Sequence, residues 1–344
     1  MPNNSKKVLL VGSNYSWSIE NFYIKYLTEL DLEIKLFPAQ VLFYDFYYAR
    51  KINKLLYRLN LSNIERNINK LFIESVELLN PTHIFVFKGM ELTPQSLLWA
   101  KQKGIKLINY NPDNPFVFSG KGSGNSNITN AIELYDLHFT YNLDIQKKLQ
   151  EEHQAKTEFL PFAFDISQDV MEVCAKEKEI VKVCFLGNPD KLRASFIKSL
   201  AENGIEIVVY GNDWGKFLNH KNIVIFPPVY GVEQWKTLRK YRVQLNLMRI
   251  HNLDSHNMRT FEIPGIGGIQ LAPDTKEHRL FFEADQEIFL YNTVEECVIK
   301  INYLLSLTTE QANQYRSYAR EACINNKHSY KDRSQQVLEL IEQL

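Results

Sequence analysis

The chain has 344 residues, of which 45% are hydrophobic and 23% are charged, a composition typical of globular proteins and long enough for two domains of roughly 150 residues each. Its 40 basic and 40 acidic residues cancel to a formal net charge of zero, which argues against nucleic acid as a partner and favours a small or neutral one. Four widely spaced cysteines without a CxxC pair make a disulfide framework or a cysteine metal site a poor explanation.

Short apolar, β-rich runs alternate with helical patterns in the first half of the chain. Strands are predicted at residues 7–13, 33–39, 82–89 and 105–111, and helices at 19–30, 47–79 and 94–104. This alternation predicts right-handed crossovers and a parallel sheet, whose functional loops lie at the carboxyl ends of the strands. Those ends are residues 12–17, 88–92 and 109–118.

Residues 41–61 combine many aromatic and aliphatic side chains with the cations Arg50, Lys51, Lys54 and Arg58. A basic, aromatic helix of this kind can lie on a membrane or hold a lipid-linked acceptor, but helix packing inside the domain explains it at least as well. A peripheral membrane contact therefore stays open. Elsewhere the N-terminal apolar run is short and no run of about 18 apolar residues occurs, so we expect a cytoplasmic protein.

Residues 111–127 are rich in Pro, Gly, Ser and Asn and predict a long surface loop. Two more strands are expected at 135–142 and 157–165, and the proline in the second predicts that the end of that strand is a connector. A helix over 166–178 leads into the second half. There the pattern begins again. Strands are predicted at 181–188, 205–213, 222–228, 243–249, 267–272 and 287–292, with helices at 190–203 and 232–241, a TTEQ capping box at 308–311 and a last helix near Tyr330.

The two halves predict an α/β protein with two Rossmann-like, doubly wound parallel sheets that face a cleft, a usual place for a nucleotide-containing ligand. We place the first domain at 1–165 and the second at 166–325. The remaining segment, 326–344, is expected to form a helix that packs back towards the first domain.

A turn after the first strand of the second half is a candidate phosphate site. Gly187 and Asn188 precede a helix that carries Lys191 and Arg193 in its first turn. Backbone amides at a helix start, together with these cations, favour an anion such as a diphosphate, although such turns are frequent in α/β proteins without that role. The chain has no GxGxxG and no GxxxxGK[ST] motif, which argues against nicotinamide and P-loop chemistry.

The segment 254–268, DSHNMRTFEIPGIGG, is the most informative one. Asp254 and Glu262 offer acids for sugar hydroxyls, and Arg259 offers a planar cation for phosphate oxygens. Gly265 and the glycines after it permit close approach of a ligand to the backbone. The alternative is structural: Glu262 caps a helix and Arg259 pairs with it.

These residues, with several others, resemble the CgeB-like branch of the group 1 glycosyltransferases. The resemblance covers nearly the whole chain and lies in the order of its motifs. They are NPTHIFVFKGMELTP, NYNPDNPF, EFLPFAFD, FLGNPDKLRASFIKSLAENGIEIVVYGNDW, NMRTFEIPGIGGIQLA, LFFEADQEIFLYNTVEECVIKINYLL and KHSYKDR.

The resemblance implies a GT-B fold, in which the first lobe binds the acceptor and the second binds a nucleoside diphosphate sugar. By position, Asp254 approaches the donor sugar and Glu262 holds the ribose hydroxyls. Asp254 departs from the glutamate of the wider superfamily, since its side chain is one methylene shorter. Arg259, Arg193 and the amides near Gly187 then neutralise the leaving diphosphate. No DxD follows a strand, so we expect no metal and no other cofactor.

The remaining candidates have weaker support. Asp113 is either a general base for the acceptor hydroxyl or the side chain of an Asx-turn. His256 and Asn257 are expected near the donor, and Tyr230 near the nucleobase. Lys88 and Glu91 are possible acceptor contacts, whereas His138 is expected in the core.

The sequence therefore predicts a transferase that moves a sugar from a nucleotide donor to the hydroxyl of a glycan, lipid-linked or protein acceptor. The spacing of Asp254 and Glu262 favours retention of configuration, and a working Asp113 base favours inversion. Two alternatives stay open: a sugar-nucleotide epimerase of the same fold, and a catalytically degenerate scaffold that binds nucleotide sugars.

Overall fold

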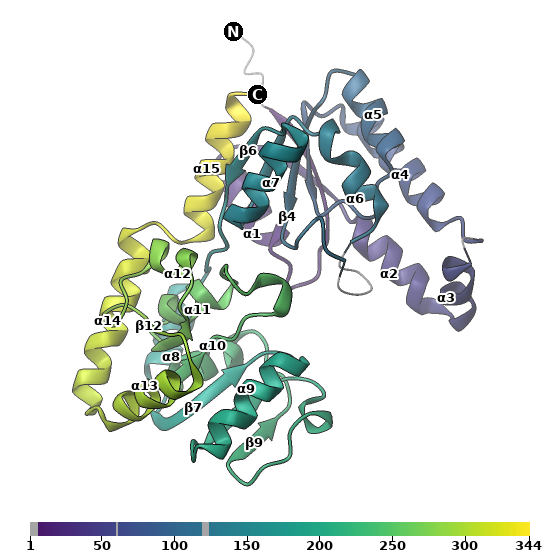
Figure 1. The fold of residues 1–344 in the computed structure, drawn as a ribbon. Coiled ribbons are helices and arrows are strands. Elements are labelled where there is room, and N and C mark those ends of the chain that lie inside the picture. Colours follow the sequence, from purple (N-terminus) through teal and green to yellow (C-terminus); the bar gives the residue numbers. More distant parts are fainter. Residues whose placement is uncertain (1–5, 60, 119–123) are drawn as a thin grey trace. The chain divides into compact units, whose positions relative to one another are not determined.

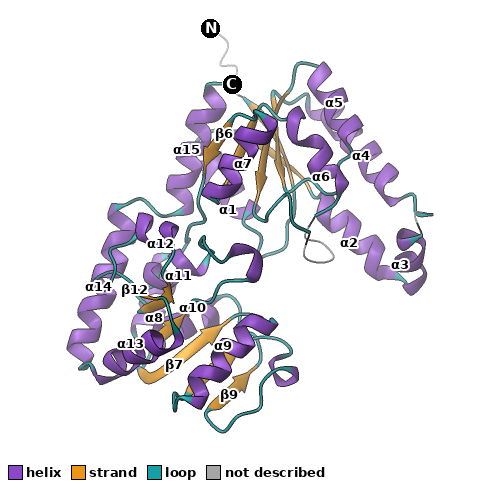
Figure 2. Cartoon of the chain, viewed as in Figure 1, coloured by secondary structure: helices purple, strands orange, loops and turns teal. Residues whose placement is uncertain are grey.

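The computed structural model describes residues 6–59, 61–118 and 124–344 of the chain. It divides into two compact units, of which unit 1 comprises Met1–Pro161 and Tyr330–Leu344, and unit 2 comprises Phe162–Ser329. Each unit has a six-stranded sheet with helices packed around it (Figures 1 and 2). The expected loop over 111–127 falls in part on residues 119–123, outside the described residues.

All neighbouring strands of unit 1 are parallel. In spatial order they are β2 (Glu33–Phe37), β1 (Lys7–Val11), β3 (His83–Phe87), β4 (Lys106–Asn111), β5 (Leu137–Thr140) and β6 (Thr157–Phe159). The order reverses between β1 and β3, so the sheet is doubly wound and its switch point lies there. Val8 pairs with Ile34 on one side and with His83 on the other.

Helices cover the sheet of unit 1. They are α1 (Glu20–Glu29), α2 (Ala39–Ala49), α3 (Lys51–Arg58), α4 (Ile64–Leu79), α5 (Pro94–Gln102), α6 (Ser126–Ala131), the short η1 (Ile132–Leu134), α7 (Leu143–His153) and α15 (Tyr330–Glu342). The C-terminal helix α15 packs on α1, where the rings of Phe22 and Tyr330 stack at 4.6 Å. Lys6 also donates from Nζ to the carbonyl oxygen of Ile341 at 2.7 Å, which holds the end of α15 to unit 1.

The long helical region predicted over 47–79 is divided among three helices, α2, α3 and α4. Arg50 is extended, with φ −144° and ψ 147°, and separates α2 from α3. The break lets α3 fold back on α2: the Tyr57 ring meets Phe43 edge-on at 4.9 Å, and Asn53 Nδ2 donates to the carbonyl of Phe46. Aromatic packing between helices thus overrides the helical pattern of the sequence.

Unit 2 repeats the architecture with a second parallel sheet. Its strands, in spatial order, are β12 (Phe289–Tyr291), β11 (Gln270–Pro273), β10 (Tyr241–Leu245), β7 (Ile180–Leu186), β8 (Ile207–Tyr210) and β9 (Ile223–Phe226). The switch point lies between β7 and β10. The two sheets confirm the predicted fold class.

The helices of unit 2 are α8 (Gln168–Ala175), α9 (Lys191–Glu202), η2 (Trp214–Lys216), α10 (Val232–Lys240), η3 (Ile250–Asn252), α11 (Arg259–Gly265), α12 (Lys276–Phe281), α13 (Val294–Ser306) and α14 (Thr309–Asn325). The predicted capping box is confirmed, since Thr308 and Gln311 exchange their side-chain hydrogen bonds at the start of α14. The strand predicted over 157–165 ends early at Phe159, before Pro161, which cannot donate a ladder hydrogen bond. Beyond it Phe164 forms only an isolated bridge with Ser329.

A buried ion triad connects three elements of unit 2. Glu179, directly before β7, accepts hydrogen bonds from Arg242 of β10 at 2.7 and 2.6 Å and from Arg316 of α14 at 2.6 Å. Both arginines are almost fully buried, with exposed fractions of 1% and 3%. Burial tends to raise the pKa of Glu179, but the bonds and charges of the two arginines outweigh it and lower the pKa to about 2. Glu179 is therefore ionised at neutral pH.

No helix among the described residues has the length and apolar character needed to cross a bilayer.

Candidate functional site

The candidate site of unit 2 lies at the carboxyl edge of its sheet, where the chain leaves β7 and β10. After β7 the chain passes through Gly187 into α9, and after β10 it runs through residues 246–258 into α11. These two strands are neighbours on either side of the switch point. The loops that follow them therefore begin side by side and run to opposite sides of the sheet, which leaves a crevice where ligands bind in such folds.

Arg193 joins these two loops. Its guanidinium donates from Nε and Nη2 to the carbonyl oxygen of Leu247 at 3.1 and 2.7 Å, and from Nη1 to that of Asn188 at 3.1 Å. The side chain is only 10% exposed. Arg193 thus has a structural task that its sequence position did not indicate, although a guanidinium with five N–H groups retains donors for a ligand.

Two further arginines lie close enough to Arg193 for their charges to affect its pKa. Burial lowers the pKa of Arg193 to about 10, and the positive charges of Arg249 and Arg259 lower it as well, against the opposing charge of Asp190. Two of these three guanidinium groups have a carboxylate partner, Asp190 for Arg193 and Glu262 for Arg259, so the three together leave a region of net positive charge near the end of β7. Such a region favours a multiply charged anion.

The backbone amides contribute less than the sequence predicted. The amide of Gly187 donates to the carbonyl of Tyr210 at 3.0 Å, as part of the sheet. Asp190 caps α9 by accepting from the amide of Arg193 at 2.9 Å, so the helix start already faces a carboxylate. The Gly187 carbonyl accepts from Nε1 of the buried Trp214 at 2.8 Å. At this turn the groups that can still bind an anion are therefore the arginines more than the backbone amides.

Arg259 and Glu262 form an ion pair within the first turn of α11. Nη1 of Arg259 contacts Oε2 of Glu262. Arg259 is 25% exposed at its side chain and Glu262 is 7% exposed, so the carboxylate is held from inside while the guanidinium reaches the surface. Nε of Arg259 also lies 3.5 Å from the carbonyl oxygen of Leu186, the last residue of β7. The structural alternative for this pair is thus present, and it fixes the cation at the end of β7.

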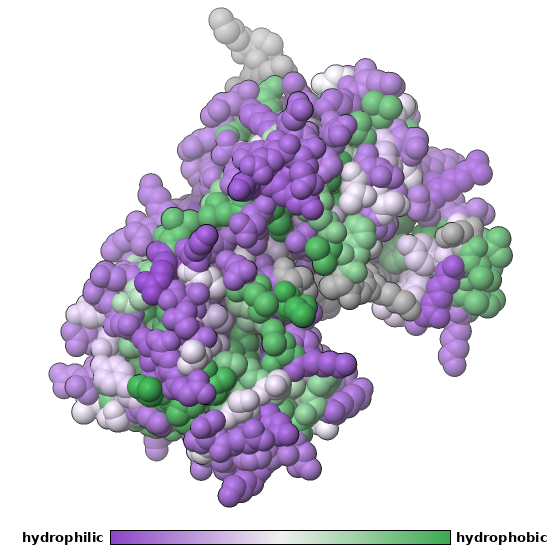
Figure 3. All heavy atoms as spheres, viewed as in Figure 1, coloured by the Kyte–Doolittle hydropathy of each residue, from purple (hydrophilic) through white to green (hydrophobic). Residues whose placement is uncertain are grey.

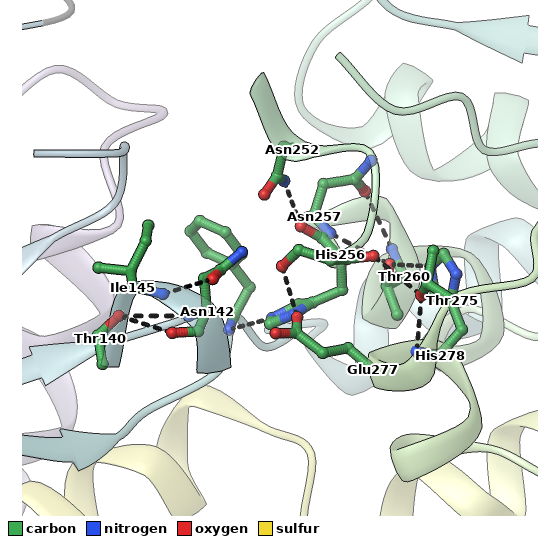
Figure 4. A network of polar contacts seen from close by, with 12 residues as sticks. Thr140, Asn142, Ile145, Asn252, His256, Asn257, Thr260, Thr275, Glu277 and His278 are labelled. Carbon is green, nitrogen blue, oxygen red and sulfur yellow. Dashed lines mark hydrogen bonds and ion pairs between the residues drawn. The ribbon is translucent and has the colours of Figure 1, made fainter. Parts of the chain in front are cut away.

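A buried polar network holds the start of α11 (Figure 4). Asn246 accepts from Nδ2 of Asn257 at 2.7 Å and donates to Oγ1 of Thr260 at 3.2 Å. The Thr260 hydroxyl lies 3.0 Å from Nε2 of His278, whose Nδ1 lies 2.8 Å from the carbonyl oxygen of Pro273. Since a carbonyl can only accept, His278 carries its proton on Nδ1 and accepts from Thr260. Every member has a defined role, so the network fixes the backbone beside Arg259.

A second set of bonds holds the residues before Asn257. Glu277 accepts from the Ser255 hydroxyl at 2.5 Å and from Nδ1 of His256 at 2.6 Å. Nε2 of His256 in turn accepts from the amide of Phe162 at 3.2 Å, and the imidazole is 0% exposed. Both ring nitrogens of His256 are bonded to the protein itself, so the side chain stabilises this loop. It does not present a free nitrogen to the sugar donor, which corrects the expectation that it lies near that donor.

His278 provides a prediction for pH dependence. Burial lowers its pKa from 6.5 to about 4, partly offset by the bond to Pro273. Because the folded protein binds this proton more weakly than the unfolded chain, the stabilisation is complete above pH 6.5 and is lost as the pH falls through about 4, by roughly 3 kcal/mol. We expect urea unfolding of the wild type and of His278→Gln to differ less at pH 4.5 than at pH 7.5. A difference that is constant over this range would contradict the neutral histidine.

Other predicted residues of this site lie in different surroundings. Asp254 is exposed, in the turn before the buried Ser255. Tyr230 is 63% exposed and follows β9, at the far edge of the sheet from β12. Gly265 is buried, and a Cβ there would lie 2.7 Å from Cγ of Phe164. The close approach that this glycine permits is therefore to the protein's own aromatic ring and not to a ligand, which corrects the expectation.

Unit 1 has its own polar cluster at the carboxyl ends of β3 and β4. Nζ of Lys88 pairs with Oδ2 of Asp113 at 2.6 Å, and the lysine side chain is 9% exposed while that of Asp113 is 41% exposed. The Asx-turn at this place is made by Asn111, whose Oδ1 accepts from the Asp113 amide at 3.0 Å. The Asp113 carboxylate is thus left to the ion pair and to solvent. His138 lies in the core, as expected, 4% exposed.

Two buried carboxyl groups lie near Lys88. Burial raises the pKa of Glu91 to about 7, with Lys88 opposing the shift and Glu20 adding to it. Glu20 accepts from the Ser13 amide at 2.9 Å, at the end of β1, and burial raises its pKa too. Glu91 is therefore divided between its two protonation states at neutral pH, as a general base requires. Sequence reasoning gave it only a contact role.

Several residues of the site of unit 2 were not predicted from the sequence. Arg249, Asn246, Thr260, Glu277 and His278 act through contacts between segments that are far apart in the chain. One signal was present in the sequence. Gln244 in β10 and Asn246 directly after that strand are polar residues inside an apolar run, and buried polar groups need hydrogen-bond partners. Within the described residues, no group of three or more His, Cys, Asp or Glu side chains is placed to hold a metal ion.

Comparison with known proteins gives one family match and many structural matches. Residues 193–339 match the family model described as glycosyl transferase-like. A search among curated proteins gives no match.

Three solved structures illustrate the structural likeness. A glycosyltransferase from Rickettsia africae is 14% identical with a TM-score of 0.68, over 99% of this chain and 98% of that one. Anabaena HepE, in complex with UDP-glucose, is 12% identical with a TM-score of 0.65, over 98% and 100%. A UDP-GlcNAc 2-epimerase from Neisseria meningitidis, bound to UDP-GlcNAc, is 13% identical with a TM-score of 0.58, over 98% and 100%. The two doubly wound sheets are those of the GT-B fold.

Proposed function

We propose that this chain transfers a sugar from a nucleoside diphosphate sugar to the hydroxyl group of an acceptor. The observation that carries the proposal is the positive region at the end of β7, where the charges of Arg249 and Arg259 act on Arg193 and Glu262 is paired with Arg259. The glycosyl transferase-like match over residues 193–339 supports it. So does the same fold in a protein solved with UDP-glucose.

In this proposal the arginines bind the diphosphate of the donor. The leaving nucleoside diphosphate gains negative charge as the glycosidic bond to it breaks, and fixed guanidinium groups stabilise that charge without reorganising. The reaction then needs no divalent ion. Glu262 binds the ribose hydroxyls, and Asp254 at the exposed turn approaches the sugar. Arg193 orients the two loops as well as contributing charge, because it bonds the carbonyl oxygens on both sides.

The acceptor is a glycan, a lipid-linked molecule or a protein, and unit 1 offers two candidates for the group that takes its proton. Asp113 is the more exposed but is paired with Lys88. Glu91 is buried and titrates near neutral pH.

Replacing these two residues separately distinguishes them. We expect Glu91→Gln to lower kcat about 100- to 10,000-fold if Glu91 is the base, and the wild-type rate then rises with pH up to its pKa of about 7. If Asp113 is the base, Asp113→Asn has the large effect and the rate shows no such rise near pH 7. Rates are compared at saturating donor, so that binding does not contribute.

A sugar-nucleotide epimerase is the second candidate, favoured by the likeness to the Neisseria enzyme bound to UDP-GlcNAc. An epimerase changes its nucleotide sugar without any acceptor, whereas a transferase releases nucleotide in an acceptor-dependent way. A degenerate scaffold binds the nucleotide sugar and changes nothing.

One experiment separates the three. The purified chain is titrated with UDP, GDP, dTDP and CMP sugars while its thermal unfolding is followed. The sugars that stabilise it are then incubated with mixed acceptors, with EDTA or with Mg²⁺. Nucleotide release that needs an acceptor and survives EDTA supports the metal-independent transferase. If the nucleotide sugar is epimerised without an acceptor, or is bound but not converted, the transferase proposal is wrong.

A further inference from the structure

The surface around α3 is not used by the proposed function. α3 has no buried residue, and Figure 1 shows it beyond the end of α2, away from the sheet of unit 1. Large apolar side chains here are exposed to solvent. They are Tyr48 at 64%, Ile52 at 51%, Leu55 at 50%, Leu59 at 56% and Leu61 at 67%. We call these five side chains the α3 apolar surface; hydrophobic atoms are visible at this end of the molecule in Figure 3.

The helix is anchored to unit 1 by its other side. Tyr57 packs on Phe43 at 4.9 Å and lies 5.7 Å from Tyr47, and Asn53 donates to the Phe46 carbonyl. Ile52, Leu55 and Leu59 follow one another at spacings of three and four residues, so they form one stripe along the helix. The stripe is exposed because Asn53 and Tyr57, which contact α2, lie on the opposite face of α3.

The charge beside this stripe has one sign. Lys51, Lys54 and Arg58 repeat the same spacing one position earlier, and Arg50 precedes them, whereas residues 46–64 contain no Asp or Glu. Nζ of Lys54 lies 4.4 Å from the centre of the Tyr48 ring. An apolar stripe beside a row of cations, with a tyrosine at its edge, is the composition of helices that lie in the interface of a membrane.

We propose that the α3 apolar surface binds the surface of an anionic phospholipid membrane. Eight residues of helix are about 12 Å long, so α3 lies in the plane of the interface and does not span it. Its leucines and Ile52 enter between the acyl chains, while Lys51, Arg58 and Arg50 meet lipid phosphates. A second copy of the chain is a poor occupant, because a two-fold interface would bring these cations against their own copies. The proposal does not depend on the sugar-transfer chemistry.

The test is flotation of the full chain with vesicles, in the absence of any nucleotide sugar. We expect binding to vesicles of phosphatidylcholine with 30% phosphatidylglycerol, and weak binding to pure phosphatidylcholine. Since each surface cation contributes about a five-fold factor, Lys51→Glu with Arg58→Glu should lower the partition coefficient at least about 20-fold. Ile52→Ser, Leu55→Ser and Leu59→Ser together should lower it at least about 10-fold.

Matched controls lie on other helices of unit 1. Lys147→Glu with Lys148→Glu on α7 makes the same change of charge, and Leu78→Ser on α4 removes a leucine that is 91% exposed. Neither should alter binding. Equal binding to both vesicle types, or equal losses in the controls, would overturn the proposal. So would a vesicle-free dimer or an acidic protein complex that the α3 variants abolish while vesicle binding persists.

A fluorescent label reports insertion directly, even if a multiple variant folds poorly. The four native cysteines are buried, so Leu55→Cys can be labelled selectively with an environment-sensitive dye. Its emission should shift to the blue with anionic vesicles, whereas the same dye at Leu78→Cys should not respond. An unchanged emission at position 55 contradicts the proposal.

Discussion

Arg259→Ala is expected to weaken the binding of the donor nucleotide sugar about 10- to 100-fold. A hydrogen bond to a charged group contributes about 1.5 to 3 kcal/mol, and each 1.4 kcal/mol corresponds to a factor of ten. Arg259 can make such a bond, because its side chain is 25% exposed and its guanidinium lies at the end of β7, paired with Glu262. Isothermal titration with the sugar nucleotide that binds the wild type measures the change.

The controls for this prediction separate phosphate contact from general damage. If Arg259 binds the diphosphate, the loss appears with the nucleoside diphosphate and disappears with the nucleoside alone. Arg259→Lys keeps the charge but not the planar fork, so it should recover only part of the affinity. Arg279→Ala removes a surface guanidinium that pairs with Asp274 in the same unit, and should leave affinity unchanged. If the wild type and Arg259→Ala bind the nucleotide sugar with equal affinity, Arg259 is not part of the donor site.

The second large effect is expected on stability. Glu179→Gln removes the negative charge shared by Arg242 and Arg316 and leaves two buried guanidinium groups uncompensated. Breaking a buried ion pair by removing one partner costs about 3 to 5 kcal/mol. We therefore expect a loss of this size in the free energy of unfolding of unit 2, measured by urea denaturation followed by circular dichroism. Glu206→Gln, which breaks an ion pair with Lys182 on the surface, should leave the free energy of unfolding almost unchanged.

The pH dependence of the same triad provides an independent check. The pKa of Glu179 is about 2 in the folded protein, compared with 4.5 in the unfolded chain. Since the folded pKa is the lower one, the stabilisation is complete above pH 4.5 and is lost as the pH falls towards about 2. The wild type should therefore lose stability in acid more steeply than Glu179→Gln. If the free energy of unfolding fell equally with pH in both proteins, the two arginines would not be what lowers the pKa of Glu179.

The sequence by itself determined the sheets, because the signal for a buried parallel strand is local. Runs such as KVLLV and IVKVCFL are apolar except for one lysine each and end in glycine or polar turns. Alternation of such runs with helices allows few arrangements, since crossovers between parallel strands are right-handed. The capping box at Thr308 is equally local, requiring only residues three apart.

Contacts between distant residues set the boundaries of elements that the sequence only outlined. The helical region expected over 47–79 is divided into separate helices, because Tyr57 packs on Phe43 and periodicity does not report where a helical region folds back. At β6 the local signal was sufficient, because Pro161 follows the end of the strand at Phe159 and the chain beyond it is a connector, as the proline predicted.

The sequence also determined which residue types the site would contain, namely arginines and acids around a glycine turn. Only the tertiary structure decided what each of them does. Arg193 bonds a carbonyl 54 residues away, and His256 bonds a carboxylate 21 residues away. A guanidinium or an imidazole has the same composition whether it faces a ligand or the protein's own backbone. Its role is set by which polar groups the folded chain brings within about 3 Å, and that distance is a property of the fold.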